Sequence, residues 1–184
     1  MLDKAVRAWR RFCGWLDAVK SRSVQQGSGK HPAPRVRLVP VTTPEQDQLA
    51  VGMYARNPSS FLVSPKTMAE LKDRQARGTE YFLLYNAADE LIGARGFRPV
   101  DALLQHSVVD KGFRGQGYWQ ASDAAMDKLL AERGFTHVHG NVFANNARIQ
   151  HAMLATGWKL EPHPTEKDLI KGTKKLPPAG GGNK

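Results

Sequence analysis

The sequence lacks most of the features that mark a secreted or membrane protein. It has a single cysteine, Cys13, which cannot form an internal disulfide, so we expect a reducing compartment, the cytoplasm. No segment approaches the roughly 20 consecutive apolar residues that a membrane-spanning helix needs. The first residues also lack the uninterrupted apolar stretch of a secretory signal, and we expect none. These absences favour a cytoplasmic protein.

Acidic residues are scarce at both ends of the chain. The formal net charge is +10, from 27 Lys and Arg against 17 Asp and Glu. Residues 1–36 hold 8 basic and 2 acidic residues, residues 171–184 hold 4 lysines and no acid, and residues 37–170 hold 15 of each sign. The centre of the chain is therefore formally neutral, which argues against a nucleic-acid-binding domain. The charge distribution therefore gives the least support to a nucleic-acid or ribosome-associated protein that would use its two basic ends as arms.

The composition is that of an ordinary globular chain, with 41% hydrophobic and 24% charged residues in 184. Composition shifts divide it into four segments. These are a basic amphipathic helix (1–20), a flexible linker rich in Gly, Ser and Pro (21–35), a folded domain (36–170) and a basic disordered tail (171–184). We therefore expect one domain with two extensions.

The N-terminal segment places Trp9, Phe12 and Leu16 on one helical arc and basic residues on the other. The apolar arc could be buried on the protein's own core, on a partner protein or on an anionic membrane face. A mitochondrial transit peptide has a similar pattern, but Asp3 and Asp17 argue against it. Residues 1–20 are thus a candidate adapter to a membrane surface or a partner protein.

Hydrophobic periodicity within the domain predicts strands and helices in a mixed order. Strands are expected at 36–41, 80–87, 90–97, 103–110, 136–143 and from Trp158, and helices at 44–56, 65–77, 118–133 and 146–156. Thr43 followed by Pro44 is typical of a capped helix start. Hairpins come first and strand-helix-strand units later. This order predicts an α/β fold, with one mixed sheet covered by helices.

A glycine-rich turn, residues 112–117 (GFRGQG), joins the strand at 103–110 to the helix at 118–133. The first N–H groups of a helix have no intrahelical acceptor, so such a turn can bind an anion. The alternative is a plain helix cap at a tight turn. The turn lacks the Gly-Lys-Ser/Thr of a P-loop and the GxGxxG of dinucleotide sites. It is therefore a candidate phosphate site of another kind.

Two elements of the chain match one family. Arg114 and Gly117, after Val108-Val109-Asp110, fit the pattern Arg/Gln-x-x-Gly-x-Gly/Ala, and a second element runs from Val142 through Asn146 to Gly157-Trp158. On these residues the chain resembles the GNAT superfamily of acyl-CoA-dependent N-acyltransferases, over about residues 36–160. The resemblance implies a central, mostly antiparallel sheet with a V-shaped splay, flanked by helices. It also implies an N-acetyltransferase or other acyltransferase.

The resemblance further implies acetyl-CoA or another acyl-CoA as co-substrate, and no metal. The pyrophosphate would bind the backbone amides of Arg114, Gly115, Gln116, Gly117 and Tyr118. The pantetheine arm would run beside Val108 and Val109 and contact Asn146, which we include with the catalytic residues. A primary amine would attack the thioester directly in a ternary complex. The acceptor is an amine-bearing small molecule or protein, and a homodimer is compatible with the sequence.

Three positions depart from the family's pattern. Trp119 stands at the sixth motif position, where Gly or Ala is usual. Met153 stands where many members have the tyrosine that protonates the leaving thiolate, and Leu103 where some have a glutamate base. Neither side chain can transfer a proton. A catalytically degenerate fold that binds acyl-CoA as a sensor or scaffold is therefore the alternative function.

Other polar residues are candidates for catalysis or acceptor binding. His106 is the candidate general base, with an ordinary pKa near ~6.5, and a hydrogen-bonded structural histidine is the alternative. Because strand side chains alternate, we expect Gln105 and Ser107 on the face opposite His106. His137 and His139 share a strand face, but no third metal ligand accompanies them. The resemblance also places Tyr54, Arg56, Asn57 and Phe61 on the acceptor side; an ordinary surface loop is the alternative.

Overall fold

The structure is a computed structural model that describes residues 34–58 and 64–179. The expected N-terminal helix (1–20), the linker up to residue 33 and Phe61 lie outside these residues. Within them, no helix is long and apolar enough to cross a membrane.

Seven strands form one sheet in the order β1-β2-β3-β4-β5-β7-β6. They are β1 (Arg37–Pro40), β2 (Glu80–Tyr85), β3 (Leu91–Arg98), β4 (Leu103–Val109), β5 (His137–Phe143), β6 (Lys159–Pro162) and β7 (Leu169–Lys175). Every neighbouring pair is antiparallel except β4 and β5, which are parallel. The mixed, mostly antiparallel α/β sheet expected from the sequence is confirmed.

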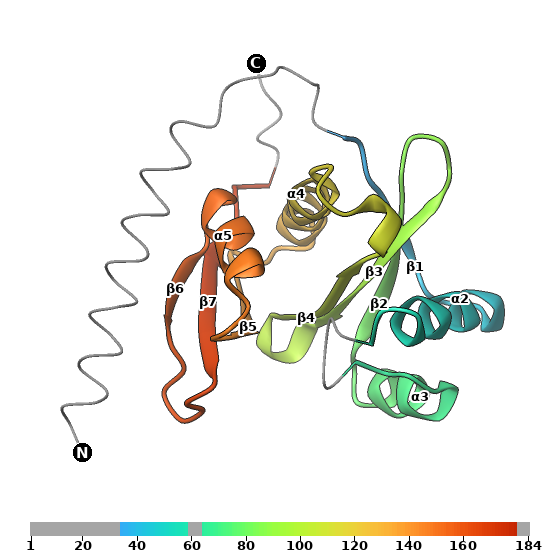
Figure 1. Ribbon diagram of the computed structural model, residues 1–184, viewed down its shortest axis with the longest axis horizontal. Coiled ribbons are helices and arrows are strands. Elements are labelled where there is room, and N and C mark those ends of the chain that lie inside the picture. Colours follow the sequence, from blue (N-terminus) through green and yellow to red (C-terminus); the bar gives the residue numbers. More distant parts are fainter. Residues whose placement is uncertain (1–33, 59–63, 180–184) are drawn as a thin grey trace. The chain divides into compact units, whose positions relative to one another are not determined.

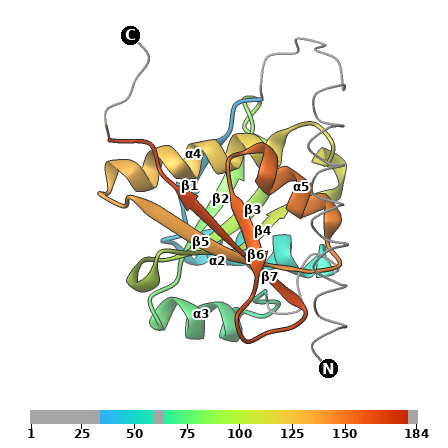
Figure 2. The same cartoon turned by 90° about the vertical axis from the view of Figure 1, so that its left-hand side faces the viewer.

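Helices cover both faces of the sheet (Figure 1). Helices α2 (Pro44–Ala55) and α3 (Met68–Ala76) pack on one face, and α4 (Tyr118–Glu132) packs on the other. Figure 2 shows α4 above the sheet and α3 below it. Helix α5 (Ala147–Ala155) contacts α4 and β6. Between the sheet and α2 and α3 lies a core that includes Met53, Tyr54, Leu83 and Val108.

Helices α2 and α3 begin with complete capping boxes. The Thr43 hydroxyl accepts from the Gln46 amide and the Gln46 side chain accepts from the Thr43 amide, and Thr67 and Glu70 repeat the arrangement in α3. These bonds satisfy N–H groups that a helix start otherwise leaves without acceptors. The N-termini of α2 and α3 are therefore closed to an anion.

The sheet splays between β4 and β5. The two strands pair at Leu103 and His139, and the His139 amide donates to the Ala102 carbonyl at 3.0 Å. Beyond this junction they separate, so the sheet has a first half (β1 to β4) and a second half (β5 to β7). At the junction the backbones are close, because a Cβ on Gly140 would lie 3.0 Å from the Leu104 carbonyl oxygen. The V-shaped splay implied by the family resemblance is present.

Strand β4 carries a bulge at His106. Ala94 of β3 pairs with Val108 and Gly96 pairs with Gln105, so three steps on β4 match two on β3. His106 has φ +51°, in the left-handed region. Its ring stacks on Tyr81. A Cβ on Gly96 would meet the side chains of both Tyr81 and Gln105, so Gln105 lies on the same face as Tyr81. Our expectation that Gln105 and His106 face opposite sides is therefore wrong, because the bulge interrupts the alternation.

The expected boundary at residue 170 is also wrong. Residues 171–175, which we expected to begin a disordered tail, form most of β7 between β5 and β6. Ile170, Gly172 and Lys174 are buried on one face of this strand. The lysines made the segment resemble a solvated tail, but Lys174 is buried against carboxylates of α4.

Candidate functional site

The turn after β4 presents backbone N–H groups that have no backbone acceptor among the described residues. Gly115 and Gly117 have φ +82° and +80°, conformations that a residue with a Cβ rarely adopts. Gly117 is the N-cap of α4 and provides no side-chain cap. In the described part of the chain, none of the amides from Gly115 to Trp119 donates to a backbone carbonyl. Unlike α2 and α3, α4 thus begins with its donors available to an anion.

Side chains hold this turn against the end of α2. Arg114 donates from Nε to the Val109 carbonyl at 2.9 Å and from Nη2 to Asn57 Oδ1 at 2.8 Å. Asp110 accepts from Arg56 Nε and from the Lys111 amide, both at 2.6 Å. Burial alone would raise the pKa of Asp110, but these hydrogen bonds keep it below its usual value. The guanidinium of Arg114 thus supports the turn from inside.

The end of α2 differs from an ordinary surface loop. Tyr54 and Asn57 are each 1% exposed. Asn57 donates to the Met53 carbonyl at 2.9 Å while it accepts from Arg114. This segment therefore connects the expected acceptor side to the turn that precedes α4.

A cavity of about 470 Å³ occupies the splay. It is lined by residues 103–107 of β4 and 140–143 of β5, together with Arg95, Trp119, Asn146, Ile149, Met153, Trp158, Glu166, Asp168 and Leu169. Val108 and Val109 are not among these lining residues, and the Val108 side chain belongs to the core under α2. The cavity therefore begins before the two valines that we expected beside the pantetheine arm.

The second element of the family resemblance forms one wall of the cavity. The Asn146 side chain caps α5 by accepting from the Ile149 amide at 3.3 Å, and both residues line the cavity. Met153 also lines it, with its methyl carbon packed on β7 so closely that a Cβ on Gly172 would collide with it. The residue at the family's tyrosine position therefore reaches the cavity without a proton to donate.

His106 is buried and contacts the side chains of Tyr81 and Arg74. It is 4% exposed, its Nδ1 lies 3.2 Å from the Tyr81 hydroxyl, and its Nε2 lies 3.4 Å from Arg74 Nη1. Burial, with smaller contributions from Arg74 and Arg98, lowers the pKa of His106 to about 3. The pKa is therefore not the ordinary ~6.5, because the ring has lost its water and no carboxylate of the described residues bonds to it. This environment favours the structural histidine, and a role of His106 as general base stays a prediction.

Sequence reasoning missed the polar residues on the α4 side of the cavity. Arg95 is 1% exposed in β3, and Asp123 of α4 is fully buried. Asp123 and Asp127 share the helix face of the buried Met126 and Leu130, at the spacing of core positions. A carboxylate at such spacing, and an arginine inside an apolar strand, were the signals available in the sequence.

In the described ranges, no group of three or more His, Cys, Asp or Glu side chains could hold a metal ion. His139 contacts the Asp101 carbonyl through Nε2 at 3.1 Å, and His137 contacts the neighbouring Thr136 hydroxyl at 3.2 Å.

Comparison with known proteins identifies the fold. No family model matches the chain, and no curated protein matches it. Spermidine N-acetyltransferase from Vibrio cholerae, solved with CoA and spermine, is 14% identical, with a TM-score of 0.63 over 77% of this chain and 96% of that one. Ribosomal-protein-S18-alanine N-acetyltransferase from Escherichia coli is 17% identical, with a TM-score of 0.61 over 79% and 97%.

An acetyltransferase from Thermus thermophilus is similar to the same extent. It is 19% identical, with a TM-score of 0.60 over 79% of this chain and all of that one (100%). At these identities the likeness concerns the fold. The chain has the fold of the GNAT acetyltransferases.

Proposed function

We propose that the protein is an N-acyltransferase that moves an acetyl or other acyl group from acyl-CoA to a primary amine by direct attack in a ternary complex. One observation supports this above all: the turn after β4 leads into an uncapped α4 whose first amides have no backbone acceptor in the described residues, and β4 lines the cavity in the splay. A phosphate-bearing ligand with a long thin arm fits such a site.

The amides of Gly115, Gln116, Gly117, Tyr118 and Trp119 would hold the pyrophosphate. The Arg114 amide already donates to the Lys111 carbonyl at 3.4 Å, so it contributes less than we expected. The arm would enter between β4 and β5, with Asn146 on one wall and Trp119 on the other. Trp119, despite its size at the sixth motif position, leaves the cavity open.

The cavity favours a cationic acceptor. Glu166 and Asp168, from the turn between β6 and β7, line it and have no ion-pair partner in the described residues. Two carboxylates give this wall a negative potential that attracts a protonated amine. With His106 neutral and Met153 inert, these carboxylates and solvent are the groups that move the protons of the reaction.

A glycine substitution tests the phosphate site. In Gly117→Asp the new carboxylate would face the phosphates, and we expect acetyl-CoA to bind at least ~10-fold more weakly, a loss of about 1.4 kcal/mol. Gly134→Asp is the matched control, because Gly134 follows the same helix with φ +89° and a Cβ there meets nothing within 4 Å. Calorimetry that gives both variants the wild-type affinity would refute the site.

Turnover is measured separately, by release of free thiol from acetyl-CoA. The acceptors should include spermidine, spermine and a peptide with an amino-terminal alanine, because structurally similar proteins act on such amines. We expect thiol release with at least one of them. Binding without turnover would favour the degenerate sensor or scaffold instead.

A further inference from the structure

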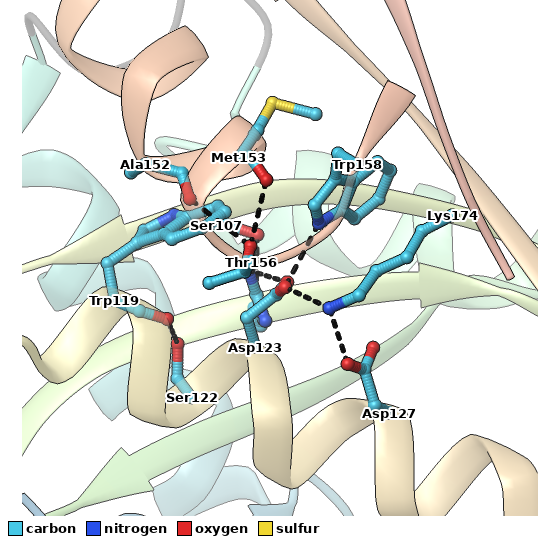
Figure 3. A network of polar contacts seen from close by, with 11 residues as sticks. Ser107, Trp119, Ser122, Asp123, Asp127, Ala152, Met153, Thr156, Trp158 and Lys174 are labelled. Atoms are coloured by element: carbon cyan, nitrogen blue, oxygen red, sulfur yellow. Dashed lines mark hydrogen bonds and ion pairs between the residues drawn. The ribbon is translucent and has the colours of Figure 1, made fainter. Parts of the chain in front are cut away.

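One buried carboxylate joins the two halves of the sheet. Asp123 Oδ1 accepts from Arg95 Nη2 at 3.1 Å, and Arg95 belongs to β3 in the first half. Asp123 Oδ2 accepts from Lys174 Nζ of β7 at 2.7 Å and from Nε1 of Trp158, the residue just before β6, at 3.0 Å, so both donors lie on the side of the second half (Figure 3). Thus one carboxylate oxygen of Asp123 binds the first half of the sheet and the other oxygen binds the second half.

The same network forms the α4 side of the cavity. Arg95 donates from Nε to the Ser107 hydroxyl at 2.7 Å, and its guanidinium lies 5.2 Å from the centre of the Trp119 ring. Arg95, Ser107, Trp119 and Trp158 all line the cavity, whereas Asp123 is not among the lining residues. Asp123 therefore acts on the cavity through the side chains that it holds.

Stability alone does not account for burying these charges. The free energy lost when an ion pair leaves water is about as large as the free energy gained from the attraction of its charges. A buried pair can, however, fix the relative positions of the elements that it joins. Burial would raise the pKa of Asp123, but the charges of Arg95 and Lys174 keep it below its usual value. The carboxylate stays ionised and can hold both cations at fixed positions.

The distance that this network would fix is the separation of β4 and β5 along the cavity. The backbone pairs β4 with β5 at Leu103 and His139, and the strands then diverge along the cavity. Helix α4 packs over this region, and Asp123 is the α4 residue bonded to both sides.

We propose that Asp123 is a positioning residue that sets the separation of the two halves of the sheet, and with it the width of the cleft. The role in binding rests on the proposed function, since the cleft would receive the arm of acyl-CoA. Without the carboxylate, β3 and β7 lose their common partner and the open ends of the two halves move more freely.

The separation can be measured without any ligand. Spin labels would be attached at Ala88→Cys, in the exposed turn between β2 and β3, and at Lys167→Cys, in the exposed turn between β6 and β7. Cys13→Ser removes the native cysteine. We expect one narrow distance distribution in the parent protein and a shifted or broader one in Asp123→Asn. An unchanged distribution would overturn the proposal.

A milder variant guards against misfolding. Lys174→Met removes one link to the second half and leaves Arg95 paired with Asp123, and Lys174 does not line the cavity. Asp47→Asn is the matched control, since Asp47 is 2% exposed, binds Lys72 and Gln75, and lies on the opposite face. We expect both network variants to broaden the distance distribution and the control to leave it unchanged.

Binding supplies the second readout. Well below the unfolding temperature, we expect the CoA Kd to rise about tenfold in Asp123→Asn and severalfold in Lys174→Met, and to stay within about twofold of wild type in Asp47→Asn. In the network variants, the ratio of kcat/KM for butyryl-CoA to kcat/KM for acetyl-CoA should also rise, because a wider cleft admits the longer acyl chain more easily. Wild-type Kd and selectivity in folded network variants would overturn the proposal. A wild-type protein that binds no CoA would instead refute the proposed function, while the spin-label distances still report on Asp123.

Discussion

The two faces of the sheet around β4 bury polar side chains in opposite ways. Toward α2 and α3 the structure places Tyr54, Tyr81 and His106, whose rings pack against one another. Burial raises the pKa of both tyrosines and lowers that of the histidine, so all three stay neutral. Toward α4 it places Arg95, Asp123 and Lys174, which are joined as ions.

The difference follows from what surrounds each group. Asp123 has two cations within hydrogen-bonding distance, and they outweigh the cost of its burial. His106 contacts tyrosines and Arg74 and, among the residues that the structure describes, bonds to no carboxylate, so the loss of water decides its charge. A buried site therefore keeps its charge where the opposite charge is built beside it. One face of β4 is packed by neutral aromatic rings, and the other faces a network of buried ion pairs.

Removing the central charge should have the largest effect on stability. Asp123→Asn leaves Arg95 and Lys174 buried without their common counter-ion, and we expect a loss of about 3–5 kcal/mol in the free energy of unfolding. Urea denaturation at pH 7 measures it. A loss below ~1 kcal/mol would mean that the two faces do not differ as described.

Because His106 is neutral when it is buried, the free energy of unfolding should depend on pH. His106 has a pKa of about 3 when folded and ~6.5 when unfolded. Below pH ~6.5 the unfolded chain therefore binds a proton that the folded protein does not, and stability falls as the pH drops.

We expect wild type to lose about 1.4 kcal/mol per pH unit between pH 6 and pH 4 beyond any loss in His106→Gln. Urea denaturation of both proteins at pH 4, 5 and 6 gives the two slopes. Parallel slopes would show that His106 is protonated in the folded protein.

A hydroxyl deletion on the neutral face should cost less than the charge deletion. Tyr81→Phe removes the partner of His106 Nδ1, which lies 3.2 Å from the hydroxyl. We expect a loss of about 1–2 kcal/mol, because one buried hydrogen bond is lost and a polar nitrogen is left without a partner. If Tyr81→Phe lowered the free energy of unfolding in urea as much as Asp123→Asn does, the two faces of the sheet would not differ in the way described.

The smallest effect should come from an exposed ion pair. Arg37 and Asp89 lie 2.6 Å apart, with side chains 57% and 78% exposed. We expect Asp89→Asn to change stability by no more than about 0.5 kcal/mol, since water and salt screen the pair. The same change at Asp123 should cost several times more, and equal costs in paired urea titrations would show that burial is not what matters.

The sequence predicted the elements that local signals define. Thr43 and Pro44 marked the start of α2, and Gly117 and Gly134 bracketed α4. The glycine turn before α4 was recognisable because its requirement for positive φ is local. The helices and most strands could therefore be predicted from neighbouring residues, and the splayed sheet from the family resemblance, while the phosphate site stays a prediction.

The rest depends on partners far apart in the chain. Strand β7 has alternating burial, but its lysines suggested a solvated tail; Lys174 is buried because it binds Asp123, 51 positions earlier. The bulge at His106 is set by register with β3, and the pKa of His106 is lowered mainly by burial, with smaller contributions from Arg74 and Arg98. Such contacts leave no periodic signal in a single sequence.

The divergence of β4 from β5 has a consequence for aggregation. It gives the sheet four edges instead of two, and any unpaired edge is a template for another chain. The outer edges, β1 and β6, are four residues long and contain Pro40 and Pro162, which oppose further pairing. The inner edges border the cavity. The protein thus protects its outer edges with proline and short length, and turns its inner edges toward the cavity instead of toward a neighbouring chain.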